Sequence, residues 1–123
     1  MRKIFMLLAL SLIFISCEKK EDIELSKSDI VGIWNVTKIT SDGETTNLPS
    51  VTITVDLKSD DKYSVSFFGD SYAGTYTIDG STVIGVSGSI IEYFEFTSFS
   101  GNKAKIDYKN SDGDIYQFEA EKK

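Results

Sequence analysis

Apolar and polar residues alternate strictly in residues 51–58, which read VTITVDLK. Successive side chains of a β-strand point to opposite faces, so this stretch predicts a strand with its aliphatic side chains, Val51 included, on a buried face. The same alternation recurs in residues 63–67, 104–108 and 116–120. A period of two, rather than the longer period of a helix, predicts an all-β domain.

Short β-rich runs alternate with turn signals along the rest of the chain. We expect strands at 33–40, 50–58, 62–68, 72–78, 82–87, 90–99, 103–109 and 114–120. Connections such as Asp79-Gly80 suit tight hairpins, because Gly, Asn and Asp tolerate a positive φ. Hairpins join neighbouring strands, so the predicted fold is an eight-stranded antiparallel up-and-down barrel, with a curved open meander sheet as the alternative. Closure removes exposed strand edges and therefore favours the barrel.

The N-terminus has the composition of a targeting segment. Arg2 and Lys3 precede an apolar run at 4–15, which is shorter than the roughly 20 residues of a membrane span but suits a signal peptide. Small Ser16 and then Cys17, the only cysteine, follow, and the chain becomes charged directly afterwards.

Residues 14–17, which read FISC, resemble the lipobox of bacterial lipoproteins, although Phe14 stands where leucine is commonest. The resemblance implies that a signal peptide, residues 1–16, is removed and that Cys17 is acylated. It implies an exported, membrane-anchored lipoprotein, and we expect the outer membrane, with the side that it faces left open. A signal peptide followed by a free cysteine is the alternative.

The mature chain then divides into a short tether and one domain. Residues 17–27 comprise the lipidated cysteine and a flexible polar tether, and residues 28–123 form the barrel domain. Removal of 16 residues from 123 leaves 107, enough for one domain. We expect Ser28 to cap a single helical turn through residues 30–31 at its start.

Composition argues against nucleic-acid binding and catalysis. Of the 13 basic residues, Arg2 and Lys3 leave with the signal peptide, so 11 lysines face 19 acids and the net charge is −8. Phosphate backbones and anionic headgroups would repel such a chain, so its membrane contact is expected to be the lipid anchor. The chain has no histidine, the commonest general base and metal ligand. We therefore expect no enzyme, no cofactor and no metal; residues 110–114, NSDGD, resemble the start of a calcium loop but are better explained as a hairpin turn.

The triplet at 32–34, GIW, resembles the opening of lipocalin-like domains, in which G-x-W begins the first strand. Residues 61–65 and 74–78 resemble strand motifs of small lipocalin-like lipoproteins, and the similarity extends over about residues 28–121. The resemblance implies an eight-stranded barrel that binds a small apolar molecule, with Trp34 closing one end.

Two departures from that family bear on the cavity. Larger lipocalins place an arginine of the last strand over the tryptophan, and the only arginine here is Arg2. They also have a long first loop at the cavity mouth, for which only residues 41–49 are available here. A small cavity or none is therefore expected.

Aromatic side chains of inward parity, together with two polar residues of the same parity, are the candidate lining of an interior ligand site. They are Trp34, Lys38, Tyr63, Phe67, Tyr76, Glu92, Phe94, Phe96, Tyr108, Tyr116 and Phe118. An inward Lys38 would meet a ligand carboxylate, whereas a position near a strand end would let it reach water. The same aromatic residues can also simply fill a barrel of eight strands.

Two functions follow from these observations. The first is a lipid-anchored barrel that binds a small apolar or amphipathic ligand, with no nucleic-acid partner and no protein partner identified. The alternative is a filled barrel of the cell envelope that contacts other proteins or polymers through its outer surface. Phe68 and Phe99, which fall out of phase with their inward neighbours, are the candidates for that surface.

Overall fold

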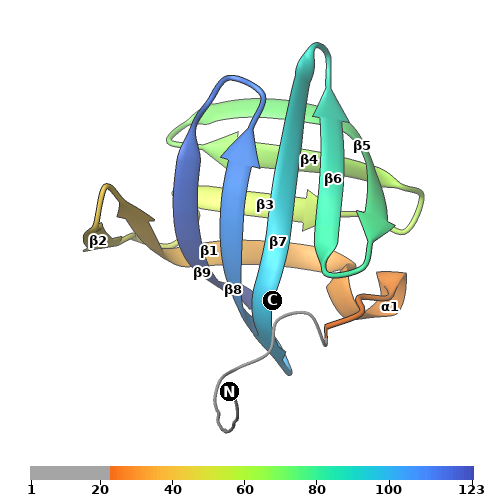
Figure 1. The fold of residues 1–123 in the computed structure, drawn as a ribbon, viewed down its shortest axis with the longest axis horizontal. Helices are drawn as coiled ribbons and strands as arrows, with labels where there is room; N and C mark the ends of the chain where they lie inside the picture. Colours follow the sequence, from red (N-terminus) through yellow and green to blue (C-terminus); the bar gives the residue numbers. More distant parts are fainter. Residues whose placement is uncertain (1–22) are drawn as a thin grey trace, which may run out of the picture.

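The computed structural model describes residues 23–123, which form a single antiparallel sheet that closes on itself (Figure 1). Strand order in the sheet is β2-β1-β3-β4-β5-β6-β7-β8-β9, and an additional pairing of β1 with β9 closes the ring. The predicted all-β, eight-stranded antiparallel barrel is confirmed, with β2 as one extra strand, and the open meander sheet is wrong. The signal peptide and Cys17 lie outside the described residues.

The elements follow one another in simple order along the chain. They are α1 (Lys27–Ile30), β1 (Gly32–Ser41), β2 (Glu44–Asn47), β3 (Ile53–Leu57), β4 (Lys62–Phe67), β5 (Asp70–Asp79), β6 (Thr82–Ser87), β7 (Ile90–Ser100), β8 (Lys103–Asn110) and β9 (Ile115–Lys122). No helix in this part of the chain is long and apolar enough to cross a membrane.

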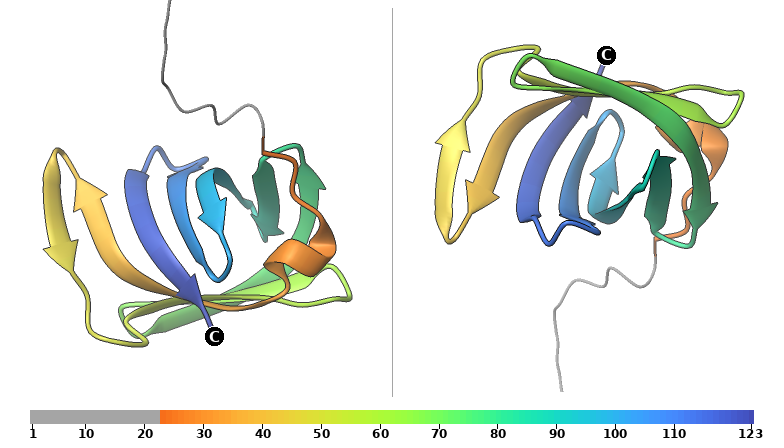
Figure 2. Two further views of the ribbon diagram at one scale, coloured as in Figure 1. Left: turned by 90° about the horizontal axis from the view of Figure 1, so that it is seen from below. Right: turned by 90° about the horizontal axis from the view of Figure 1, so that it is seen from above.

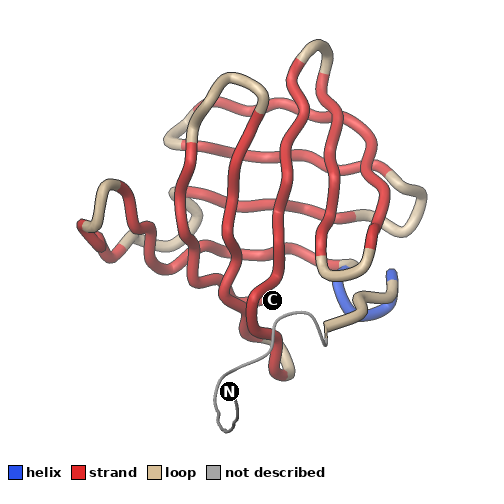
Figure 3. The backbone as a smooth tube through the Cα atoms, viewed as in Figure 1, coloured by secondary structure: helices blue, strands red, loops and turns tan. Residues whose placement is uncertain are grey.

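The barrel is flattened into two layers whose strands cross steeply. In Figures 1 and 3, β1, β3 and β4 run across the molecule, and β7, β8 and β9 run over them. Figure 2 shows the layers curving round an interior, with β2 outside them beside the second half of β1. Alternate hairpin turns therefore gather at two ends: the turns after β4, β6 and β8 at one, and α1 with the turns after β3, β5 and β7 at the other.

The connection between β1 and β3 differs from the sequence-based prediction. Residues 44–47 form β2, which the sequence analysis missed because all four residues are exposed and show no apolar alternation. The predicted strand at 50–58 is shorter, beginning at Ile53. Val51 is 61% exposed rather than buried, has a φ of 59°, and donates its N–H to Asn35 Oδ1 at 2.8 Å. It therefore belongs to the turn that enters β3.

Two β-bulges reverse the inward and outward parity along their strands. In β1 the register with β9 shifts between Val36 and Lys38, so Ile39 packs against the core and Lys38 is exposed. The Lys38 Nζ lies 4.0 Å from Glu119 Oε1 on the outer surface. The expectation that Lys38 shares an inward face with Trp34 is therefore wrong.

The bulge in β7 has the opposite effect on an aromatic residue. The register of β7 with β8 shifts between Phe96 and Ser98. The Phe99 ring consequently packs against the core, with its centroid 6.2 Å from those of Trp34 and Phe96. The assignment of Phe99 to an outer contact surface is wrong.

Trp34 and α1 close one end of the barrel. The Trp34 side chain is 2% exposed and donates its indole N–H to the Ile30 carbonyl oxygen at 2.9 Å. The helical turn begins after Ser26, not Ser28, and the Asp29 carboxylate accepts from the Ser26 N–H at 3.0 Å. Leu25 packs against the core and donates its N–H to Gly80 O at 2.9 Å, so residues assigned to the tether already contact the barrel.

A lysine of the last strand covers Trp34 from outside. Lys122 Nζ lies 5.6 Å from the ring centroid of Trp34 and donates to Asp29 O at 2.7 Å. Gly32 has a φ of 140°, and a Cβ there would lie 2.9 Å from Lys122 Cδ. The glycine of the G-x-W triplet thus makes room for the lysine beside Trp34.

We expect Trp34→Phe to lower the free energy of unfolding by about 1–3 kcal/mol, because it leaves the buried Ile30 carbonyl without its donor. Urea denaturation measures this loss. Ile33→Ala, on the outer face of the same strand, is the control and should change stability by less than about 0.5 kcal/mol. Equal losses in the two variants would contradict the role given to the indole hydrogen bond.

Candidate functional site

The barrel interior is filled at the closed end. Apolar side chains from both layers surround a void of only ≈ 10 Å³ there. They are Trp34, Val36, Val55, Leu57, Phe94, Phe96, Ile106, Phe118 and Ala120. Trp34 and Phe96 meet edge to face with ring centroids 5.6 Å apart. This void is no larger than about the space of one water molecule, so this half of the barrel is a packed core.

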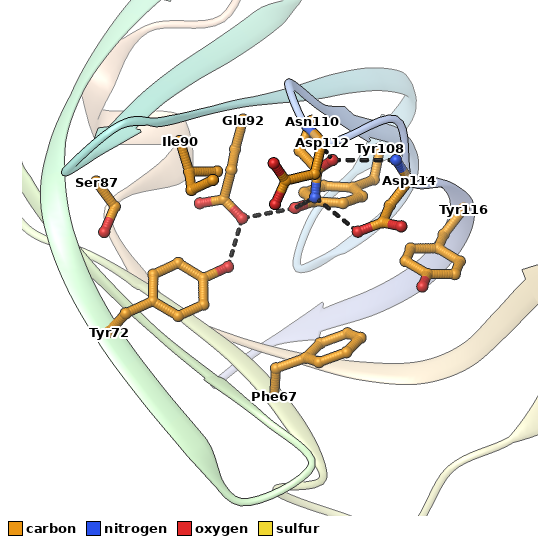
Figure 4. A pocket seen from close by; sticks show the side chains of 10 residues that line it. All are labelled: Phe67, Tyr72, Ser87, Ile90, Glu92, Tyr108, Asn110, Asp112, Asp114 and Tyr116. Atoms are coloured by element: carbon orange, nitrogen blue, oxygen red, sulfur yellow. Dashed lines mark hydrogen bonds between the residues drawn. The ribbon is translucent and has the colours of Figure 1, made fainter.

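The opposite end holds an open pocket of ≈ 310 Å³ (Figure 4). It lies among the ends of β4, β5, β6, β7, β8 and β9 and the turn that follows β8. Its lining residues are Phe67, Tyr72, Ser87, Ile90, Glu92, Tyr108, Asn110, Asp112, Asp114 and Tyr116.

Glu92 forms the floor of the pocket, between the open and the filled halves. Its side chain projects inward from β7 and is 1% exposed. Its Oε1 accepts the phenol proton of Tyr63 at 2.5 Å, and its Oε2 accepts that of Tyr108 at 2.6 Å. The Tyr72 hydroxyl also donates to Oε2. A buried carboxylate is costly unless hydrogen-bonded, and these three phenols satisfy most of its acceptor capacity.

The three phenols are held in their protonated, donating form. Burial raises the pKa of Tyr63, Tyr72 and Tyr108 well above the ordinary value, and the hydrogen bond and the negative charge of Glu92 raise it further. No lysine of residues 23–123 forms an ion pair with Glu92. The tyrosine hydroxyls therefore take the place that a cation fills in a buried ion pair.

Gly85 makes the approach of Tyr63 possible. It lies in β6, opposite Glu92 of β7 and Tyr76 of β5. A Cβ at this position would lie 2.6 Å from Cζ and from the hydroxyl oxygen of Tyr63. The Tyr63 ring thus lies against bare backbone, with its hydroxyl directed at the carboxylate.

The rim of the pocket includes the β8–β9 turn, as the hairpin interpretation of residues 110–114 predicted. Asn110 Oδ1 accepts the N–H groups of Asp112 and Asp114, each at 3.0 Å. Asn110 Nδ2 donates to Asp114 Oδ2 at 3.1 Å and to the Tyr108 hydroxyl at 3.0 Å. Within residues 23–123, no cluster of three or more Asp, Glu, His or Cys side chains is arranged to hold a metal ion.

Five of the predicted interior residues lie at or directly beneath the pocket. Phe67, Glu92, Tyr108 and Tyr116 line the pocket, and Tyr63 lies beneath it as a partner of Glu92.

The other predicted residues lie away from the pocket. Trp34, Phe94, Phe96 and Phe118 belong to the filled core, and Lys38 is on the outer surface. The Tyr76 hydroxyl donates to Lys58 O at 2.6 Å, at the closed end.

Sequence reasoning did not assign Tyr72, Ser87, Ile90 or the Asn110 turn to the site. Tyr72 had the signal that would have included it, because it belongs to the aromatic set of mostly inward parity and shares its parity with Tyr76 in the same β-rich run. Its pairing with Val65 of β4 turns it inward.

The fold and the pocket define a class: a small closed antiparallel barrel with one filled and one open end. No protein-family model and no curated protein matches the chain. Among solved structures, an uncharacterized protein from Bacteroides eggerthii DSM 20697 is similar, with a TM-score of 0.61 at 11% identity. The match covers 77% of this chain and 100% of that one. At this identity the likeness shows a shared fold alone.

We expect Gly85→Ala to destabilise the protein by about 1–3 kcal/mol, because the new methyl group overlaps the Tyr63 ring. Combining it with Tyr63→Leu removes the overlap, so the double variant should lose less stability than the two single losses added together. Urea denaturation of the three variants measures the coupling. Strict additivity would mean that Gly85 is not needed for the Tyr63 ring.

We expect the free energy of unfolding to stay level up to about pH 9–10 and to fall above it. The three phenols have a higher pKa in the folded chain than the value of about 10 in an unfolded one, so the unfolded state releases these protons first as pH rises. Urea titrations at a series of pH values, with tyrosinate absorbance, measure the effect. Tyr72→Phe should make the decline less steep, and an undiminished decline in that variant would contradict the assignment.

Proposed function

We propose that this chain is an exported, lipid-anchored binding protein that holds a small amphipathic ligand in the open end of its barrel. The observation that carries the proposal is the unequal filling of the interior, with ≈ 10 Å³ of free space at one end and ≈ 310 Å³ at the other. A barrel whose interior served only stability would be expected to be filled at both ends. Here the buried Glu92 carboxylate lies instead beneath an open pocket.

The size and walls of the pocket favour a small molecule over a long-chain lipid. Its volume lies near the lower limit of about 300 Å³ for ligand pockets. Phe67, Ile90 and Tyr116 offer apolar surface, and the Glu92 cluster offers a polar floor. A ligand with one apolar and one polar part matches this division.

The anchor rests on the lipobox resemblance at residues 14–17. The described chain begins at residue 23 beside the closed end, where Leu25 bonds to the β5–β6 turn. A tether from Cys17 would thus leave the pocket mouth uncovered. Catalysis has little support, because the chain has no histidine and its only cysteine is the proposed acylation site.

We expect Cys17→Ala to move the protein from the membrane fraction to the soluble fraction of expressing cells, because it removes the only acylation site. Immunoblots of the separated fractions measure this. A Cys17→Ala protein that stays with the membranes would contradict the lipid anchor and would leave the binding proposal standing.

Native mass spectrometry of residues 18–123, expressed without the signal peptide, tests the binding proposal. We expect an added mass that disappears on denaturation. Tyr116→Ala should weaken retention of this ligand about tenfold, as the loss of an aromatic contact worth roughly 1.4 kcal/mol predicts. Ile115→Ala is the matched control, since that neighbouring side chain is 71% exposed. A bare protein mass, repeated after incubation with envelope extracts, would overturn the proposal.

A second candidate is an interaction protein of the cell envelope. It is favoured by apolar side chains beside the pocket mouth, where Val51 is 61% and Phe68 56% exposed. Phe68 donates its N–H to Thr52 O, so the two exposed residues belong to adjoining turns. Cross-linking in intact cells tests it: loss of a recovered partner in Phe68→Ser would support it, and recovery of no partner would count against it.

A further inference from the structure

We propose that the pocket selects small amphipathic amines, in which a protonated nitrogen lies toward the Glu92 floor and the acidic rim and an apolar body lies against the aromatic walls. The inference rests on the proposed function and adds to it the chemical class of the ligand. Three independent features of the pocket support it: its charge, its hydrogen-bonding capacity and its aromatic faces.

The charge of the lining has one sign. Glu92, Asp112 and Asp114 line the pocket, and its other lining residues include no lysine or arginine. Lys109, which follows Tyr108 in β8, points to the outer surface, where its Nζ lies 5.4 Å from the ring centroid of Tyr93. A carboxylate ligand would therefore meet repulsion in this pocket, and a cation would meet attraction from the floor and from the rim.

In the pocket floor, the phenol protons are already used in hydrogen bonds, whereas part of the acceptor capacity of the Glu92 carboxylate is not. Each phenol has one proton, and those of Tyr63, Tyr72 and Tyr108 go to Glu92. The three bonds leave one of the roughly four acceptor positions of the carboxylate unused. The floor can thus accept further hydrogen bonds and has no proton left to donate.

The donors around the floor are also engaged. Ser87 Oγ donates to Ala73 O at 2.9 Å, and the side-chain amide of Asn110 donates to Asp114 and to Tyr108. Only the Tyr116 hydroxyl, among the lining side chains that can donate, has no hydrogen-bond partner. Apart from Tyr116, the lining therefore offers acceptors rather than donors, which favours a ligand that brings its own donors, and an ammonium group brings up to three.

The walls add aromatic surface suited to a cation. Phe67, Tyr72, Tyr108 and Tyr116 line the pocket, and Figure 4 shows Phe67 and Tyr72 across from the Tyr108–Tyr116 side. Tyr108 and Tyr116 are stacked at 6.0 Å between ring centroids, and Tyr116 lies 6.2 Å from Phe67. Aromatic faces attract ammonium groups and also cover an apolar body, so these walls serve both parts of an amphipathic amine.

Three probes of matched shape test the inference: phenethylamine, neutral 2-phenylethanol and anionic 3-phenylpropionate. Calorimetric titrations use the full chain purified from host membranes into lipid nanodiscs, with empty nanodiscs as the reference. We expect phenethylamine to bind at least about tenfold more tightly than 2-phenylethanol, the difference that one charge-assisted hydrogen bond supplies. We expect 3-phenylpropionate to bind most weakly, and added salt to weaken only the amine.

Substitutions test which residues produce the preference for the amine over the neutral probe. Glu92→Gln should reduce phenethylamine binding about tenfold and 2-phenylethanol binding much less. Because that change also disturbs the buried cluster, Asp112→Asn with Asp114→Asn provides a second test that leaves Glu92 intact, with an expected loss of about threefold for the amine. Asp42→Asn with Asp60→Asn removes the same charge from exposed turns outside the lining and should leave binding unchanged.

The outcomes separate the inference from the proposed function. If 2-phenylethanol or 3-phenylpropionate binds as tightly as phenethylamine, the inference is overturned and the binding pocket stands. The inference is equally overturned if the rim pair and its charge-matched control weaken the amine to the same extent. If no probe binds and native mass spectrometry shows a bare protein, the proposed function and the inference fail together.

Discussion

The buried carboxylate of Glu92 constrains more of this structure than any other group. A charge in the interior of a small barrel is costly unless it is hydrogen-bonded, and here the donors come from tyrosines of β4, β5 and β8. The cluster therefore ties four strands, including β7 itself, at one level of the barrel. Gly85 has no side chain because the Tyr63 ring lies where its Cβ would be.

This level separates two halves with different physical requirements. Below it, Trp34 and its aromatic neighbours exclude water, and the hydrogen bonds of Trp34 to Ile30 and of Lys122 to Asp29 hold α1 over the closed end. Hydrophobic burial there supplies stability, so the other end of the barrel can remain unfilled. The open end can therefore hold several acidic side chains, Asp112 and Asp114 among them, which a packed core could not accommodate.

The sequence predicted the strands well because alternation reports one buried and one wet face directly, as in residues 53–57 and 104–108. It failed where geometry depends on a partner strand. The bulges that turn Lys38 outward and Phe99 inward exist only in register with β9 and β8. The Glu92 cluster joins residues that are 16 to 29 positions apart in the sequence. The alternation within one strand does not indicate which distant residues it will meet. Lys122 over Trp34 was missed because only the closed ring brings the first and last strands together.

Both ends of the described chain lie at the closed end, where Leu25 bonds to Gly80 and Lys123 to Ile33. Barrels held on a surface by their N-termini would be attached through the end opposite the mouth, as a layer of identical sites that all stay open. A molecule that leaves one mouth would then meet another before it diffuses into bulk solution, because the local concentration of sites is high. Rebinding within such a layer would retain a weakly held molecule far longer than the same number of barrels dispersed in solution.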